Sequence, residues 1–114
     1  MAIIGGVNTL TIMNIKTKKS KDILTFILDG ELDEHASHDA RKFMDKALDK
    51  TGAASIVFDL NRLSFMDSTG IGVLLGRYKK IRDTRKAAYI TGANSTVSKI
   101  LTAGGIYRVM QRLE

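Results

Sequence analysis

The sequence predicts an α/β fold in which helices pack against one mixed β-sheet. Short β-branched and apolar runs, typical of strands, alternate along the chain with segments whose apolar residues recur at helical spacing. Taken in order, these segments give the series β-β-α-β-α-β-α-β, which places helices between strands. The length of 114 residues, of which 44% are hydrophobic and 26% charged, suits one hydrophobic core. We therefore expect a single domain over residues 1–114.

The first half of the chain predicts a hairpin followed by a helix. Residues 9–15 and 22–29 are β-branched and apolar, and the polar stretch from Lys16 to Lys21 between them is typical of a hairpin turn. Residues 36–50 predict a helix, which ends before the stop signal Thr51-Gly52. The face of this helix expected to be buried consists of Ala40, Phe43, Met44, Ala47 and Leu48.

The next segments predict a strand, a helix and another strand. Residues 54–60 form an apolar run typical of a central strand covered on both faces. A helix is expected to begin at Ser68 or Thr69, and residues 86–91 predict the strand that follows it. The buried stripe of this second helix is expected to consist of Ile71, Leu74, Leu75, Tyr78 and Ile81.

The C-terminal part predicts a short helix and a last strand. Asn94, Ser95 and Thr96 offer N-caps for the helix, and Gly104-Gly105 closes it. Residues 106–110 then predict the final strand of the sheet.

The candidate functional residues lie between residues 65 and 79. Ser68 is placed at a helix start, where a hydroxyl can cap the backbone and where unpaired N–H groups also favour a phosphate. Gly70, Gly72 and Gly76 lie in the first turns of this helix, at a cost of up to ~1 kcal/mol each relative to alanine. The glycines serve either an open surface for another protein or close packing on the sheet. From the residues alone both interpretations stand, as does a simple capping role for Ser68.

Two blocks of sequence point to a known family. They are Gly-Glu-Leu-Asp at residues 30–33 and residues 65–79, of which Asp67-Ser68-Thr69-Gly70 is the most specific part. In this order they resemble the STAS domain, specifically that of the anti-sigma factor antagonists. The series of strands and helices from about residue 9 to residue 112 agrees as well, so the resemblance covers nearly the whole chain. It implies a STAS-like fold.

The resemblance also implies a function. The unphosphorylated protein would bind an anti-sigma factor that is also a serine kinase, and so release a sigma factor. Phosphorylation of Ser68 would switch this binding off, and a phosphatase would reset it. The protein would then be a binding module, with no catalytic residue, cofactor or metal, and not an enzyme. The neighbours of the acceptor would be Asp33, Asp67 and Thr69, and the residues facing the partner Gly70, Gly72 and Gly76.

Asp33 would lie beside the acceptor and help to orient the serine or the nucleotide of the kinase, although a turn or helix-cap role is the alternative for this residue. Two features depart from the family pattern. The chain ends soon after the last predicted strand, where many relatives continue into a further helix, and the net charge is +6. Such a charge favours an acidic partner or a nucleic acid.

The basic residues cluster in residues 16–21 and 77–86, where solvated loop and helix faces are the simplest explanation. A basic nucleic-acid-binding domain is the alternative function, but nucleic acid is not expected as a partner, because no nucleic-acid motif is present and aromatic residues number only four Phe and three Tyr. A STAS module of another signalling assembly and a small nucleotide-binding or nucleotide-hydrolysing protein are further alternatives.

Other constellations are weak. His35 and His38 lack a third metal ligand at a recognisable spacing. Ser68 could join a histidine and Asp33 or Asp67 in a hydrolase triad, but the Gly-x-Ser-x-Gly elbow is missing. The absence of cysteine suits a reducing compartment, and no apolar run approaches the ~20 residues of a membrane helix. We expect a cytoplasmic protein with no membrane contact.

Overall fold

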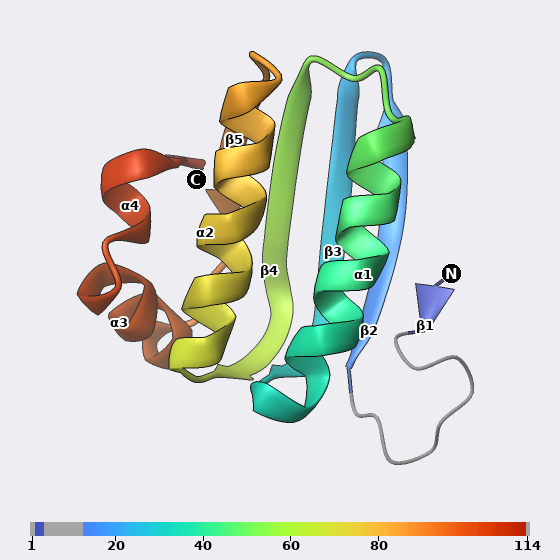
Figure 1. Ribbon diagram of the computed structural model, residues 1–114. Coiled ribbons are helices and arrows are strands. Elements are labelled where there is room, and N and C mark those ends of the chain that lie inside the picture. Colours follow the sequence, from blue (N-terminus) through green and yellow to red (C-terminus); the bar gives the residue numbers. More distant parts are fainter. Residues whose placement is uncertain (1, 4–12, 114) are drawn as a thin grey trace.

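A computed structural model describes residues 2–3 and 13–113, which form six strands and four helices (Figure 1). In chain order these are β1 (Ala2–Ile3), β2 (Asn14–Ser20), β3 (Ile23–Leu32), α1 (Glu34–Lys50), β4 (Ser55–Met66), α2 (Ser68–Asp83), β5 (Ala87–Thr91), α3 (Ser95–Ala103), α4 (Ile106–Val109) and β6 (Gln111–Leu113). This order confirms the predicted series of strands and helices. The two-residue β1 and the short α4 are additions to it.

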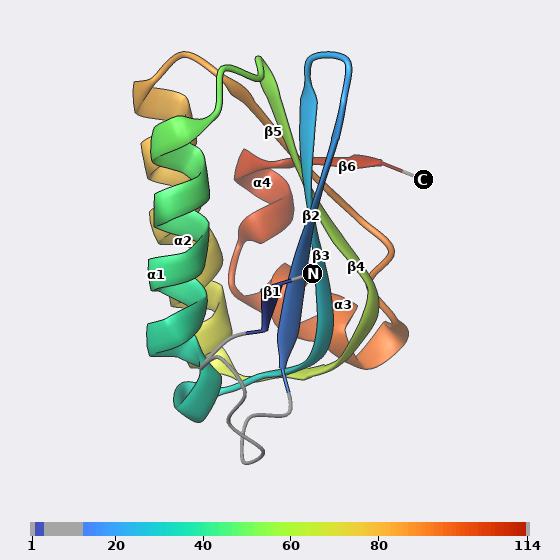
Figure 2. The ribbon, with the colours of Figure 1, turned by 90° about the vertical axis from the view of Figure 1, so that its right-hand side faces the viewer.

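The strands form one mixed sheet in the order β1-β2-β3-β4-β5-β6. The first three are antiparallel neighbours, whereas β3, β4, β5 and β6 run parallel. Parallel neighbours need a crossover, and α1, α2 and the α3–α4 pair supply the three crossovers. Helices α1 and α2 lie side by side on one face of the sheet (Figure 1, Figure 2).

The core lies between the sheet and these two helices. Alternate residues of β3 and β4 are buried, among them Phe26 and Phe58, whose rings stack with centroids 5.7 Å apart. Both predicted helical stripes face this core. The buried members are Ala40, Met44, Leu48, Ile71, Leu74 and Ile81, and the partly buried ones are Phe43, Ala47, Leu75 and Tyr78.

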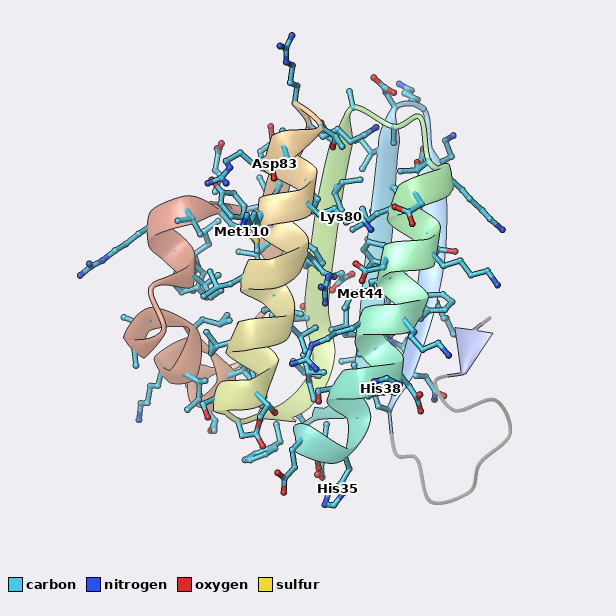
Figure 3. All side chains as sticks on the ribbon, viewed as in Figure 1. His35, His38, Met44, Lys80, Asp83 and Met110 are labelled. Atoms are coloured by element: carbon cyan, nitrogen blue, oxygen red, sulfur yellow. The ribbon has the colours of Figure 1, made fainter. Side chains whose placement is uncertain are left out.

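Charged contacts join α1 to α2 along their outer side. The Arg77 Nε atom lies 2.9 Å from Asp45 Oδ1, and the Lys80 ammonium (Figure 3) lies 2.8 Å from the Asp49 carboxylate. Burial lowers the pKa of Arg77, and the charge of Asp45 opposes that effect. Part of the basic cluster at residues 77–86 therefore has a structural role in holding the two helices together.

The N-terminal hairpin differs from the prediction. Residues 9–12 of the predicted first strand lie outside the described residues, and β2 begins at Asn14. The predicted turn from Lys16 to Lys21 is wrong, because β2 continues through Ser20 and pairs with β3 over its whole length. The turn consists of Lys21 and Asp22, with Lys21 at a φ of 55°. A polar run can form a strand here because its side chains are exposed and need no burial.

Strand β4 is longer than predicted. It continues past residue 60 as far as Met66, because it keeps its pairing with β3 up to Leu32. This extension brings the end of β4 level with the end of β3, which determines the geometry of the site described below.

The predicted last strand at residues 106–110 is wrong. Residues Ile106–Val109 form α4, and β6 follows it. In a strand, Ile106, Arg108 and Met110 would share one face, which would bring a cation into the core. In the helical turn Ile106 and Met110 are four residues apart and both buried, while Arg108 is exposed.

Candidate functional site

Two strand-to-helix junctions lie side by side at the carboxyl ends of β3 and β4. The register pairs Leu32 with Met66, and an aspartate follows each of them. The Asp67 N–H donates to the Leu32 carbonyl at 3.4 Å, which ties the second junction to the first. Both helices begin directly after their aspartate, so the N-termini of α1 and α2 come together at this end of the sheet (Figure 1).

Asp33 is the N-cap of α1. Its Oδ1 atom accepts hydrogen bonds from the N–H groups of His35 and Ala36, both at 3.0 Å. These bonds satisfy donors that have no partner inside the helix. The structure thus gives Asp33 the role of a helix cap, and its part in phosphorylation stays a prediction.

Asp67 is the N-cap of α2, so the expected capping role of the Ser68 hydroxyl is wrong. The Asp67 Oδ1 atom accepts from the N–H groups of Thr69 at 2.9 Å and Gly70 at 3.4 Å, and from the Thr69 hydroxyl. Ser68 is the first residue of the helix itself. A cap must precede the first helical residue to reach the N–H groups two and three positions ahead, and Asp67 holds that position.

The Asp67 carboxylate is held in its ionised form. Burial by itself would raise its pKa, but hydrogen bonds from the Thr69 hydroxyl and from the N–H groups of Thr69, Gly70 and Glu34 outweigh burial and lower the pKa below the ordinary value. Glu34 belongs to the first turn of α1, so the N-termini of both helices stabilise this one charge. A fixed negative charge therefore lies next to Ser68.

Ser68 and Thr69 differ in what their hydroxyls do. Ser68 is exposed, and within residues 13–113 its hydroxyl has no hydrogen-bond partner. The Thr69 hydroxyl is less exposed and donates to Asp67. Of the two neighbouring hydroxyls, only that of Ser68 is thus accessible and unengaged in the described part of the chain.

The three glycines of α2 have two different roles. Gly70 is buried, and a Cβ atom there would lie 2.5 Å from Met66 Cγ and 3.0 Å from the Leu32 carbonyl oxygen, so it permits close packing on the strand ends. A Cβ atom at Gly72 or Gly76 would meet nothing within 4 Å. Because these two residues follow Ser68 at intervals of four, all three lie on one helical face. The packing interpretation applies to Gly70, and binding at the other two stays a prediction.

Phe65 is a candidate that the sequence interpretation assigned no role. It lies three residues before Ser68 and is 42% exposed, whereas its neighbour Met66 is buried. Strand alternation indicates that the two point to opposite faces, but which one meets the core depends on where the helices pack. An exposed phenyl ring three residues before Ser68 is a typical anchor for a protein partner.

The two weak alternatives from the sequence, a histidine metal site and a hydrolase triad, do not assemble among the described residues. His35 and His38 are both exposed near the start of α1 (Figure 3). Residues 2–3 and 13–113 contain no group of three or more His, Cys, Asp or Glu side chains that could hold a metal ion. No hydrogen bond links Ser68 to a histidine in this part of the chain. Among the helices described, none has the length and apolar character needed to cross a membrane.

Comparison with known proteins agrees with this geometry. The family model of the STAS domain matches residues 14–114. Over 98 residues the chain is 36% identical to the anti-sigma F factor antagonist of Paenibacillus polymyxa, a match that covers 86% of this chain and 84% of that protein. The chain belongs to the STAS domain family of anti-sigma factor antagonists. The predicted family is therefore confirmed.

This STAS domain is similar to two solved structures of SpoIIAA. The unphosphorylated form of that anti-sigma factor antagonist matches with a TM-score of 0.75 and 27% identity, over 88% of both chains. The phosphorylated form of SpoIIAA from Bacillus matches with a TM-score of 0.67 and 26% identity, over 88% of this chain and 91% of the other. The anti-sigma-B factor antagonist of Staphylococcus aureus (strain NCTC 8325 / PS 47) is 26% identical over 86% of this chain and 90% of that protein. The predicted fold is confirmed by these matches.

We expect Gly70→Ala and Gly72→Ala to change the stability of this STAS domain in opposite directions. At Gly70 the added methyl group forces Met66 or the Leu32 backbone to move, which costs about 1–3 kcal/mol. At Gly72 it meets open space and improves helix propensity, which raises the free energy of unfolding by about 0.5–1 kcal/mol. Urea denaturation measures both changes. A stabilised Gly70→Ala variant would contradict the packing role of this glycine.

Asp67→Asn should reduce the acid sensitivity of the fold. Because the pKa of Asp67 is lowered in the folded state, its ionised form contributes stability that is fully present above about pH 4 and is lost as the pH falls through the folded pKa. The free energy of unfolding of the wild type should therefore exceed that of the variant at neutral pH. This difference should shrink as the pH falls below about 4. Urea titrations across that range test the expectation, which a constant difference would refute.

Proposed function

We propose that this STAS domain is an anti-sigma factor antagonist switched by phosphorylation at Ser68. The protein is a single domain and acts in the cytoplasm, where sigma factors act. Its unphosphorylated form binds an anti-sigma factor that is also a serine kinase, and so releases a sigma factor. A phosphatase resets the phosphorylated form. The observation that carries the proposal is the accessible Ser68 on the same open helical face as Gly72 and Gly76, in a chain similar to named anti-sigma factor antagonists.

The choice of Ser68 as the acceptor rests on the contrast with Thr69. A kinase must reach the hydroxyl oxygen, and the Thr69 hydroxyl is engaged with Asp67, whereas the Ser68 hydroxyl is exposed. The related SpoIIAA has been solved in a phosphorylated form, which supports phosphorylation as the means of control. Asp33 uses Oδ1 for its two cap bonds, and its other oxygen has no hydrogen bond within the described residues. That oxygen is available to orient the acceptor or the nucleotide of the kinase.

The switch acts at the interface with the partner. A phosphate adds about −1.5 to −2 charge at the first residue of α2, where the helix dipole favours an anion, so the domain stays folded. Binding of the partner, however, would bring this new charge and the nearby Asp67 carboxylate against a surface shaped for a neutral hydroxyl. Removing such a charge from water without a counter-ion costs several kcal/mol, which is enough to abolish binding.

A nucleic-acid function is not supported by the basic cluster at residues 77–86, because much of its charge is already engaged. Arg77 and Lys80 face Asp45 and Asp49, and Arg82 contacts the neighbouring Asp83. Lys86 donates to the backbone carbonyls of residues 51 and 53. These contacts leave the cluster without a continuous row of unpaired cations that could follow a phosphate backbone.

Ser68→Asp should weaken binding to the anti-sigma factor at least tenfold, or about 1.4 kcal/mol, without a comparable change in thermal stability. Ser68→Ala should bind as the wild type does and accept no phosphate. Titration calorimetry measures the binding, and intact mass after incubation with the kinase and ATP measures the modification. Fragment spectra that place the phosphate on Thr69, or an undiminished affinity of Ser68→Asp, would contradict the proposal.

Gly72→Ala should separate binding from folding, because it is expected to stabilise the domain and yet to weaken the complex at least tenfold. The added methyl group stands on the open face next to Ser68 and would keep the partner's backbone away. Gly52→Ala is the matched control. It also meets open space, but it lies after the far end of α1 and should leave the affinity unchanged. Equal affinities for all three proteins would show that the open face of α2 is not the docking surface.

A further inference from the structure

The sheet has an open edge along most of β2. Strand β1 pairs with β2 only at Asn14 and Ile15, whereas β2 pairs with β3 from Asn14 to Ser20. Among the described residues, Lys16–Ser20 therefore have no neighbouring strand on their outer side, and we call them the free edge of β2. The backbone of such an edge presents N–H and C=O groups with which an additional strand can pair.

The free edge of β2 is strongly basic, and its charges are not compensated. It contains Lys16, Lys18 and Lys19, and Lys21 follows in the turn. Within residues 13–113 none of these lysine side chains forms an ion pair or a hydrogen bond. Asp22, the acidic residue of the same turn, forms no ion pair with them in these residues and accepts instead from the Ala54 N–H at 3.1 Å. A considerable share of the net charge of +6 thus lies on one short strand.

The pleat of β2 places these lysines on both faces of the sheet. Lys16 and Lys18 are in register with Ile27 and Thr25, on the face turned away from α1 and α2. Lys19 is in register with the buried Leu24, on the face that the helices cover (Figure 2). The side chains of a strand added at this edge would alternate between the two faces, with Cβ atoms about 4.5–5.5 Å from those of the directly opposite residues.

We propose that the free edge of β2 docks an acidic, extended segment of a partner protein, which adds to the sheet as a further strand. Backbone hydrogen bonds hold the segment. Acidic residues two positions apart meet Lys16 and Lys18 on one face, and the positive charge of Lys19 on the other face adds to the attraction. The same lysines repel the identical edge of a second copy, so the charge selects an acidic segment and disfavours self-association.

The site does not depend on the Ser68 switch, because it lies on a different strand from the β4–α2 junction (Figure 1). Edge lysines also have a purely protective use, since they prevent the edges of sheets from aggregating. The protective role alone predicts no affinity for an acidic strand. The two explanations are therefore distinguishable by binding.

The probe is a capped eight-residue peptide of alternating glutamate and valine, added to the full chain and followed by amide chemical shifts and hydrogen exchange. Binding should shift the amides of β2 and slow exchange at those that face outward. A peptide of alternating glutamine and valine is the control for charge. It should bind at least tenfold more weakly, which corresponds to about 1.4 kcal/mol.

Two triple variants with equal loss of charge locate the site. Replacement of Lys16, Lys18 and Lys19 by glutamine should weaken peptide binding at least tenfold, or about 1.4 kcal/mol. Replacement of the exposed Lys42, Lys46 and Lys79 on α1 and α2 by glutamine removes the same charge elsewhere and should leave the affinity unchanged within about twofold.

The proposal is overturned if the peptide does not bind, if its shifts map to α1 or α2, or if both triple variants lose affinity equally. It is also overturned if duplex DNA or vesicles containing phosphatidylserine bind through the same lysines as tightly as the peptide does. Dimerisation through β2, measured by analytical ultracentrifugation, would show instead that the edge pairs with a second copy. None of these outcomes bears on phosphorylation of Ser68, which is measured separately by mass.

Discussion

The parallel pairing of β3 with β4 positions the candidate site. It extends from Ile23 opposite Ser55 to Leu32 opposite Met66, and the register of the two strands shifts between these two pairs. Because the two strands end at the same level, the aspartates that follow them cap two helices whose N-termini are adjacent. A slip of one residue would reverse the faces on which the side chains of one strand lie and would remove Phe58 from its stack on Phe26. The same pairing therefore builds the core and brings the candidate functional residues together.

Asp67 connects the fold to the proposed function. Its carboxylate caps α2, engages the Thr69 hydroxyl and lies within the influence of the Glu34 N–H of α1. These contacts leave Ser68 as the neighbouring hydroxyl that a kinase can reach. They also show that this end of the sheet is suited to negative charge, so that an added phosphate would change the surface offered to a partner more than the stability of the domain.

Two groups of basic residues in the described part of the chain have different consequences. Arg77 and Lys80 contact acidic side chains of α1 and so help to hold α1 and α2 together. Lys86 donates to backbone carbonyls of the loop that follows α1 and helps to hold that loop in place. The lysines of β2 lie along an edge of the sheet, Lys18 and Lys19 exposed and Lys16 half-buried, and their side chains have no such partners within residues 13–113. Net charge alone does not distinguish these groups, and only the second group is available to a binding partner.

The fold class, the order of the main elements and the segment that carries the candidate site could be predicted from the sequence. Apolar periodicity was sufficient for α1 and α2, because their buried stripes repeat over several turns, and the Asp67-Ser68-Thr69-Gly70 block indicated the family. Prediction from the sequence pattern failed at residues 106–110 and at Lys16–Lys21. Short segments like these fit more than one structure until their neighbours in the fold are known. Only the tertiary structure decided that Asp67 caps α2, that Gly70 packs while Gly72 stays open, and that Phe65 is exposed. Those distinctions depend on which side of a strand or helix meets the core, and residues distant in the sequence determine that.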